Sequence, residues 1–170
     1  MTVAWVVLRL VHIVSGVFWV GTMLFMAGFL QPAVAAAGPE GGRVMQHLMT
    51  GTRFRTAMGA AAGLTILSGL LMYAGVSGGF QLAWIASGTG LALTVGALAA
   101  ILAAAGGGRG GGAGRRLEGL MLEVTAAGGR PTPAQAAELA ALQRRGQSTM
   151  RAAALLGLVA VAAMAVARYV

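Results

Sequence analysis

Long apolar runs separated by short polar segments form the main pattern of the chain. Four runs are apolar enough, and nearly or fully long enough, for transmembrane helices, each of which needs about 20 residues. They cover residues 3–30, 56–76, 80–105 and 152–167, and the last needs some flanking residues to reach full length. The pattern predicts an all-α fold, an integral membrane four-helix bundle with a single transmembrane domain over residues 1–170.

Residues that break helices set the expected boundaries. Proline lacks an N–H and clashes with the preceding helical turn, so Gln31 and Pro32 predict the end of the first helix. Residues 56–108 carry no charged side chain, and Ser77-Gly78-Gly79 is their one turn-like break, which predicts a tight antiparallel hairpin. The first run exceeds the roughly 7–15 apolar residues of a signal peptide, so we expect a retained helix.

The segment 106–151, between the third and fourth helices, has three parts. Residues 106–114 are mostly glycine, which predicts a flexible linker. Thr132, Pro133 and Gln135 form a capping-box pattern, which predicts a helix that continues into the fourth span. Between these parts, an apolar stripe at helical spacing predicts a short amphipathic helix on the inner membrane surface, formed by Leu117, Leu120, Met121 and Val124.

Composition supports the membrane assignment. The chain is 58% hydrophobic and 9% charged, whereas soluble domains contain about 25% charged residues. A net charge of +8 would suit nucleic acid, but the arginines lie in connecting segments, as the positive-inside rule predicts. We therefore expect the lipid bilayer as a partner and no nucleic acid. The absence of cysteine excludes disulfides and thiolate metal sites.

The arginines also predict an orientation. The first and third connecting segments hold ten of the twelve: Arg43, Arg53, Arg55, Arg109, Arg115, Arg116, Arg130, Arg144, Arg145 and Arg151. These segments are therefore expected in the cytoplasm, and both termini on the periplasmic side of a bacterial inner membrane. Five aromatic residues fall near the expected outer boundary, as an interfacial belt would: Trp5, Tyr73, Phe80, Trp84 and Tyr169.

His12 lies inside the first apolar run, where an ionisable side chain is costly and usually functional. Arg9, Gly16 and Trp19 share its helix face. Gly16 would leave room one turn below the imidazole for a flat tetrapyrrole. Because imidazole is a common axial ligand of haem iron, this face predicts a haem b site, with another tetrapyrrole not excluded.

The rest of this predicted haem site is less determined. Arg9 and Arg168 are expected near the outer surface, where they would pair with the two propionates. Three outer-half side chains are candidates for a second axial ligand, and the sequence leaves the choice open: Met72, Tyr73 and Met164. The alternative interpretation is a structural histidine that bonds a neighbouring helix, with both arginines reaching lipid phosphate.

A second cluster suggests copper more weakly. Met45, His47 and Met49 offer thioether and imidazole ligands, which suit Cu(I). On a helix, however, the two methionines share one face and His47 points nearly opposite. The alternative is an amphipathic lead-in to the second transmembrane helix.

The first helix also resembles a known group of membrane proteins. His12, Ile13, Trp19 and Gly21 match the H-I-x5-W-x-G signature of the CopD-like and HemJ-like small helical families. In the HemJ-like group this histidine ligates haem b, which the resemblance implies for His12. That group oxidises protoporphyrinogen and depends on a lysine in a later helix, and this chain contains no lysine. The CopD-like group is associated with copper handling.

Three functions are expected on this basis. The first is electron transfer or redox chemistry at haem b. The second is that of a non-catalytic accessory subunit in a larger respiratory or photosynthetic membrane complex, because all four acidic residues lie outside the spans. The third is copper handling. Whether the chain is an enzyme stays open.

Overall fold

Four long helical stretches make up the protein. The computed structural model describes residues 2–170, apart from the side chains of residues 109–111, and its described part is helical with no strand. The long stretches begin with α1 (Val3–Phe25), α4 (Phe54–Val76), α6 (Gly88–Ala126) and α7 (Pro133–Val166). All four are long and apolar enough to cross a membrane. The predicted all-α four-helix membrane bundle is therefore confirmed, and the chain is a multi-pass membrane protein.

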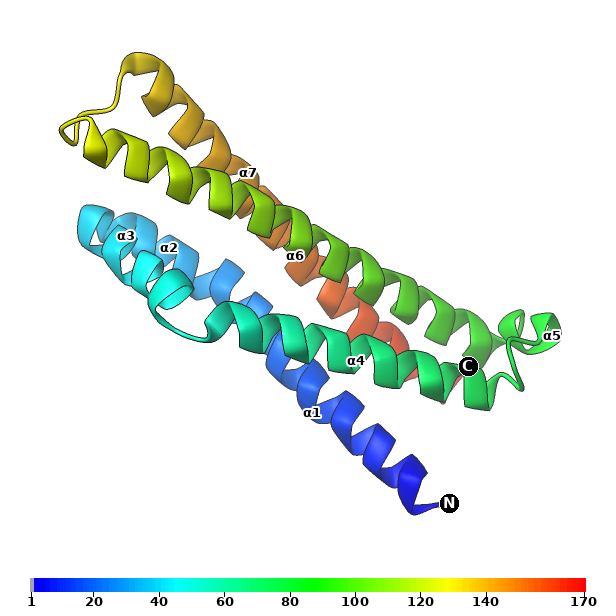
Figure 1. The fold of residues 1–170 in the computed structure, drawn as a ribbon. Helices are drawn as coiled ribbons and strands as arrows, with labels where there is room; N and C mark the ends of the chain where they lie inside the picture. Colours follow the sequence, from blue (N-terminus) through cyan, green and yellow to red (C-terminus); the bar gives the residue numbers. More distant parts are fainter. Residues whose placement is uncertain (1) are drawn as a thin grey trace.

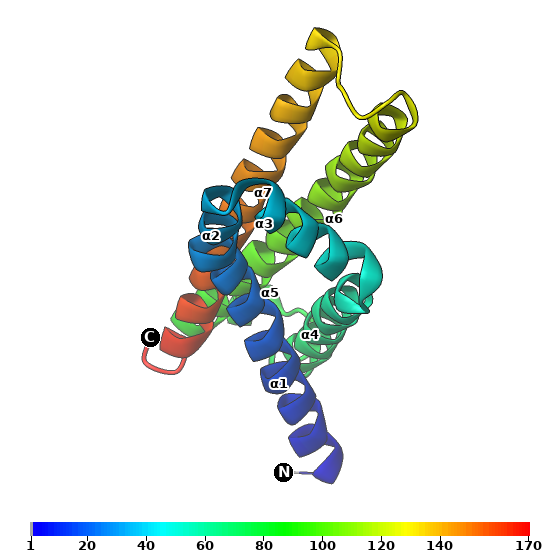
Figure 2. The same ribbon diagram turned by 90° about the vertical axis from the view of Figure 1, so that its left-hand side faces the viewer.

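The helices associate as two pairs. α1 packs mainly on α4, and α6 packs along most of its length on α7, while α4 meets α6 only lightly. Both chain ends lie at the same end of the bundle as the short helix α5 (Leu82–Ile85) (Figure 1). We call this the terminal end. The opposite end holds α2 (Gln31–Ala36), α3 (Gly38–Gln46) and the turn between α6 and α7 (Figure 1 and Figure 2).

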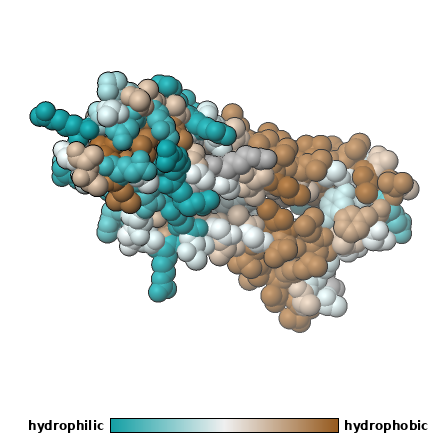
Figure 3. Space-filling view, turned by 45° about the horizontal axis from the view of Figure 1, so that its top comes forward, coloured by the Kyte–Doolittle hydropathy of each residue, from teal (hydrophilic) through white to brown (hydrophobic). Residues whose placement is uncertain are grey.

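The outer surface of the bundle is apolar. Hydrophilic side chains gather at the opposite end, and hydrophobic side chains cover most of the rest of the face in view (Figure 3). Large apolar residues are exposed on the outside of all four long helices, among them Val17, Leu67, Leu98 and Leu155. An apolar exterior of this kind indicates contact with the lipid bilayer.

Small residues form most of the core. Alanines of α4, α6 and α7 surround Trp19, Val20 and Met23 of α1, and they include Ala61, Ala99, Ala100, Ala103, Ala153, Ala154 and Ala160. Without a hydrophobic drive between helices in lipid, close van der Waals packing stabilises the bundle, and small side chains permit it. The alanine-rich sequence of α6 and α7 therefore explains why these two helices pack so closely.

The first helix does not end at Gln31 and Pro32. A π-helical turn, Met26–Leu30, follows α1 and leads directly into α2, so the helical stretch reaches Ala36. Proline clashes with the carbonyl four residues earlier in a regular helix. The carbonyl four residues before Pro32 belongs to Gly28, which lies within the π turn. A π turn is wider than a regular α-helical turn and has a different hydrogen-bond pattern. α3 and a second π turn, His47–Gly51, then lead to α4.

The second correction concerns the start of the third helix. Gly78 and Gly79 adopt positive φ, so the predicted turn is present, but α5 follows it and α6 begins only at Gly88. The hydroxyl of Ser87 caps α6 by accepting a hydrogen bond from the Gly90 N–H at 3.1 Å. The connection is therefore too long for the tight hairpin that the sequence predicted.

Residues 106–126 are not a flexible linker followed by a surface helix. They continue α6 without a break, and Gly106 faces Ala153 of α7. Leu120 and Val124 are buried, and Arg116 contacts Glu138 of α7. Two residues of the apolar stripe are thus buried where α6 packs on α7, while Met121 of the same stripe is exposed. The capping box at Thr132 is confirmed, as is the continuous run of α7 into the fourth span.

Candidate functional site

His12 and Trp5 of α1 lie against glycines of α4. A Cβ atom added to Gly69 would lie 2.8 Å from Cε1 of His12, and one added to Gly75 would lie 2.8 Å from Cζ3 of Trp5. Both distances are too short for any side chain larger than hydrogen. The two ring side chains of α1 therefore fit against α4 because α4 has glycine at both contacts.

A hydrogen bond fixes the tautomer of the His12 ring. Its Nδ1 lies 2.8 Å from the backbone carbonyl oxygen of Thr65 and 3.3 Å from Oγ of Ser68. A carbonyl oxygen only accepts, so Nδ1 carries the proton and donates it. In the neutral ring, Nε2 is then unprotonated, with its lone pair free. Nε2 forms no hydrogen bond within the described part of the chain.

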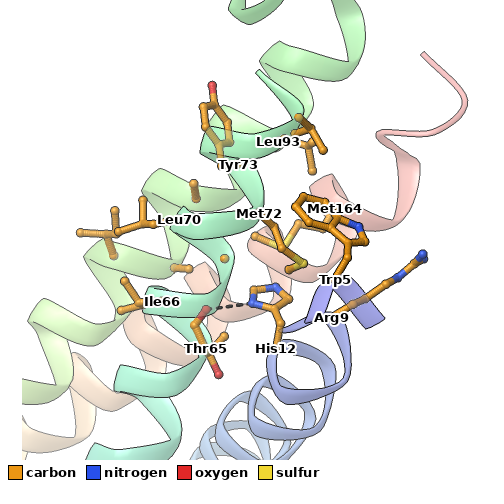
Figure 4. Close-up of a pocket in the computed structure, with 15 residues that line it drawn as sticks. Trp5, Arg9, His12, Thr65, Ile66, Leu70, Met72, Tyr73, Leu93 and Met164 are labelled. Carbon is orange, nitrogen blue, oxygen red and sulfur yellow. Dashed lines mark hydrogen bonds between the residues drawn. The ribbon is translucent and has the colours of Figure 1, made fainter. Parts of the chain in front are cut away.

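The free edge of the imidazole borders a cavity inside the terminal half of the bundle. The cavity has a volume of about 340 Å³ and is partly open to the surroundings. All four long helices contribute to its wall, which is mostly apolar. Residues from each of them line the cavity, including Trp5 of α1, Ile66 of α4, Leu93 of α6 and Met164 of α7 (Figure 4).

Two of the three candidate second ligands remain available. Met72 and Met164 both line the cavity that His12 lines (Figure 4). Tyr73 also lines it, but its hydroxyl is hydrogen-bonded to Oγ1 of Thr94 of α6. The structure therefore brings one imidazole nitrogen and two sulfur atoms to a single apolar space, a donor set that suits soft metal centres.

The two arginines expected at the propionates differ in position. Arg9 lines the cavity. The guanidinium of Arg168 instead lies 5.0 Å from the ring centre of Tyr169, and Arg168 is not among the residues described around the cavity. Of the two arginines, only Arg9 is therefore described at the cavity, and the pairing of Arg168 with a propionate stays a prediction.

Gly16 and Trp19 do not belong to the cavity. A Cβ at Gly16 would meet Cγ2 of Thr65 at 3.5 Å, so α4 fills the space that the sequence assigned to a tetrapyrrole. Beside it, the Thr65 hydroxyl is 2.8 Å from that of Ser15. Trp19 is buried in the core. The four residues share a helix face, but the cavity ends above Gly16 because α1 and α4 close on each other there.

The predicted copper cluster lies in and beside the second π turn, at the opposite end of the molecule. Met45 is in α3, while His47 and Met49 are in the turn, where the His47 side chain is exposed. The described residues contain no group of three histidine, cysteine or acidic side chains that would hold a metal ion. The copper site at these residues stays a prediction.

Ion pairs account for every carboxylate side chain. Glu40 pairs with Arg43, Glu118 with Arg55, and both Glu123 and Glu138 with Arg116. All of these groups are at least one third exposed. The glutamates thus serve local pairing at the opposite end and lie away from the cavity.

Sequence reasoning missed the residues that position His12. The Thr65 carbonyl is a backbone group, and the residue type does not indicate that this group bonds His12. Gly69 is one of 28 glycines, so its role could not be distinguished from the general glycine bias. A shared helix face located His12 and Arg9, but only the packing of α1 on α4 showed which part of that face is covered.

Comparison of the chain with protein-family models, with curated proteins and with solved structures finds no match.

Proposed function

We propose that the protein binds haem b through Nε2 of His12 and acts in electron transfer. One observation carries the proposal: His12 donates its Nδ1 proton to the Thr65 carbonyl and keeps an unprotonated Nε2 beside an apolar cavity. Metal-bound histidines commonly donate their other ring N–H to a backbone carbonyl, which fixes the ring and raises its basicity. Haem supplies one-electron redox chemistry when bound.

The surroundings of His12 suit this group. The cavity volume of about 340 Å³ is at the low end of the roughly 300–1,000 Å³ typical of ligand pockets, and its open side leaves room for a ligand to extend. Its apolar wall suits a porphyrin face. Arg9 at the cavity offers a cation for a propionate. No substrate or reaction follows from these features, so we propose no enzyme activity.

A purely structural histidine is the competing interpretation. His12 does bond the neighbouring helix, but hydrogen bonds between transmembrane helices contribute on average about 0.6 kcal/mol. This is a small gain for placing an imidazole among apolar residues. A structural role also uses only Nδ1, whereas His12 shares its cavity with the thioethers of Met72 and Met164.

We further propose the orientation and membrane. Ten arginines belong to the segments at the opposite end or leading to it, and the positive-inside rule assigns that end to the cytoplasm. The haem would then lie in the half of the bundle nearer the outer face of a bacterial inner membrane. A periplasmic or membrane-bound redox partner would have the shorter path to it.

The test uses the two histidines of the chain. Protein purified in detergent from haem-replete cells should show a Soret band, and His12→Ala should lose it. His47→Ala is the matched control, because His47 is exposed and distant from the cavity, and it should keep the band. Extraction of the pigment would distinguish haem b from another tetrapyrrole. A colourless wild-type protein that folds normally would refute the proposal.

A further inference from the structure

The cavity lies between the two helix pairs, and its donor atoms come from both. His12 belongs to the α1–α4 pair. Met72 belongs to the same pair and follows Gly69, the residue in contact with the imidazole, by three positions. Met164 comes from α7, in the other pair. A ligand held in the cavity would therefore meet His12 from the α1–α4 pair and Met164 from the α6–α7 pair.

The Met164 side chain also has a defined place on its wall. A Cβ at Gly96 of α6 would lie 3.1 Å from Cγ and 3.4 Å from Cε of Met164, the two carbons bonded to its sulfur. The thioether of Met164 thus packs against Gly96, which is buried. Methionine is otherwise a flexible side chain with three rotatable bonds. The contact with Gly96 restricts that freedom and keeps the sulfur at the cavity.

We propose that Met164 would supply the second protein ligand of the haem iron, in addition to His12. This inference rests on the proposed function. Met72 belongs to α4, the helix against which the His12 imidazole packs at Gly69, whereas Met164 comes from the other helix pair. The hydroxyl of Tyr73 is engaged by Thr94. Paired histidine and methionine ligands give a low-spin haem and raise its reduction potential, which suits an electron carrier that accepts electrons readily.

The experiment compares two methionine variants of the full-length protein in detergent. Met164→Leu keeps an apolar side chain of similar size but removes the sulfur donor. We expect it to retain haem through His12, to become high-spin, to bind carbon monoxide when reduced, and to show a lower midpoint potential. Met72→Leu tests the other thioether of the cavity, and it should keep the low-spin spectrum if Met164 is the ligand. Met164→His should restore a low-spin haem at a potential below that of the wild type.

The possible failures are distinguishable. If the wild type and both variants lack a Soret band, the haem proposal itself is refuted. If Met164→Leu keeps a low-spin spectrum and Met72→Leu becomes high-spin, haem is bound but Met72 is the ligand. If wild-type haem is already high-spin, or neither leucine variant changes it, a thioether ligand from Met164 is refuted while His12 ligation stands. Size-exclusion profiles of each variant exclude misfolding as the cause.

Discussion

The two halves of the bundle are packed on different principles. In the terminal half, Trp5 and His12 stand between helices and are accommodated by glycines of α4, which leaves a cavity among four helices. Toward the other half, alanines close the space: Ala103 of α6 is 1% exposed and Ala153 of α7 is 2% exposed. Both groups of residues belong to helices that are apolar enough to span a membrane. The difference shows that the arrangement of large and small side chains, rather than hydropathy, determines where a membrane bundle keeps a site.

The largest expected effect comes from filling the contact between His12 and α4. In Gly69→Leu the new side chain would collide with the imidazole, since even a Cβ lies 2.8 Å from Cε1. His12 must then leave the Thr65 carbonyl, and we expect complete loss of haem absorbance. Gly59→Leu is the control on the same helix, because a Cβ at Gly59 meets nothing within 4 Å. Absorbance spectra that are equal in the two variants would contradict this account of the site.

A smaller effect is expected from two substitutions in α6, one at the cavity and one in the core. Ala97 lines the cavity, whereas Ala103, six residues later on α6, is fully packed. Overpacking a core costs about 1–3 kcal/mol, so Ala103→Leu should lower the thermal unfolding temperature and spare haem binding in the folded fraction. Ala97→Leu should do the reverse, with near-normal unfolding and weakened haem binding. Thermal melts with and without added haem measure the unfolding temperature and the haem binding of each variant. If the two variants change both quantities in the same way, cavity and core do not differ as proposed.

Much of the fold was predictable because hydropathy reports directly on membrane insertion. The four spans, the helical class and the capping box at Thr132 follow from local residue patterns. The exceptions have two causes, packing on a partner helix and local irregularity within a helix. Residues 106–114 look like a linker in isolation, yet they are helical where α6 lies along α7. Pro32 looks like a helix end, yet a π turn lets the helix pass it.

The candidate site was predictable only at its polar residues. His12 and Arg9 stand out because ionisable groups are rare in apolar runs. Gly16 and Trp19 were assigned to the site from helix periodicity, which identifies a face but not the depth at which a neighbouring helix covers it. Met164 was one of three equal candidates. Only the packing of α7 against Gly96 of α6 distinguishes it, and that contact joins residues 68 positions apart.

The smallest effect is expected where the bundle carries its charges. Arg116 of α6 contacts Glu138 of α7 at 3.0 Å and Glu123 at 3.6 Å, and all three side chains are at least 42% exposed. Exposed ion pairs of this kind contribute about 0–1 kcal/mol. Because Glu123 would still pair with Arg116, Glu138→Gln should lower the unfolding temperature less than Ala103→Leu and leave the haem spectrum unchanged. If it instead destabilises the protein as strongly as Ala103→Leu, the α6–α7 pair depends on its ion pairs as well as on alanine packing, and the contrast between the two halves must include charge.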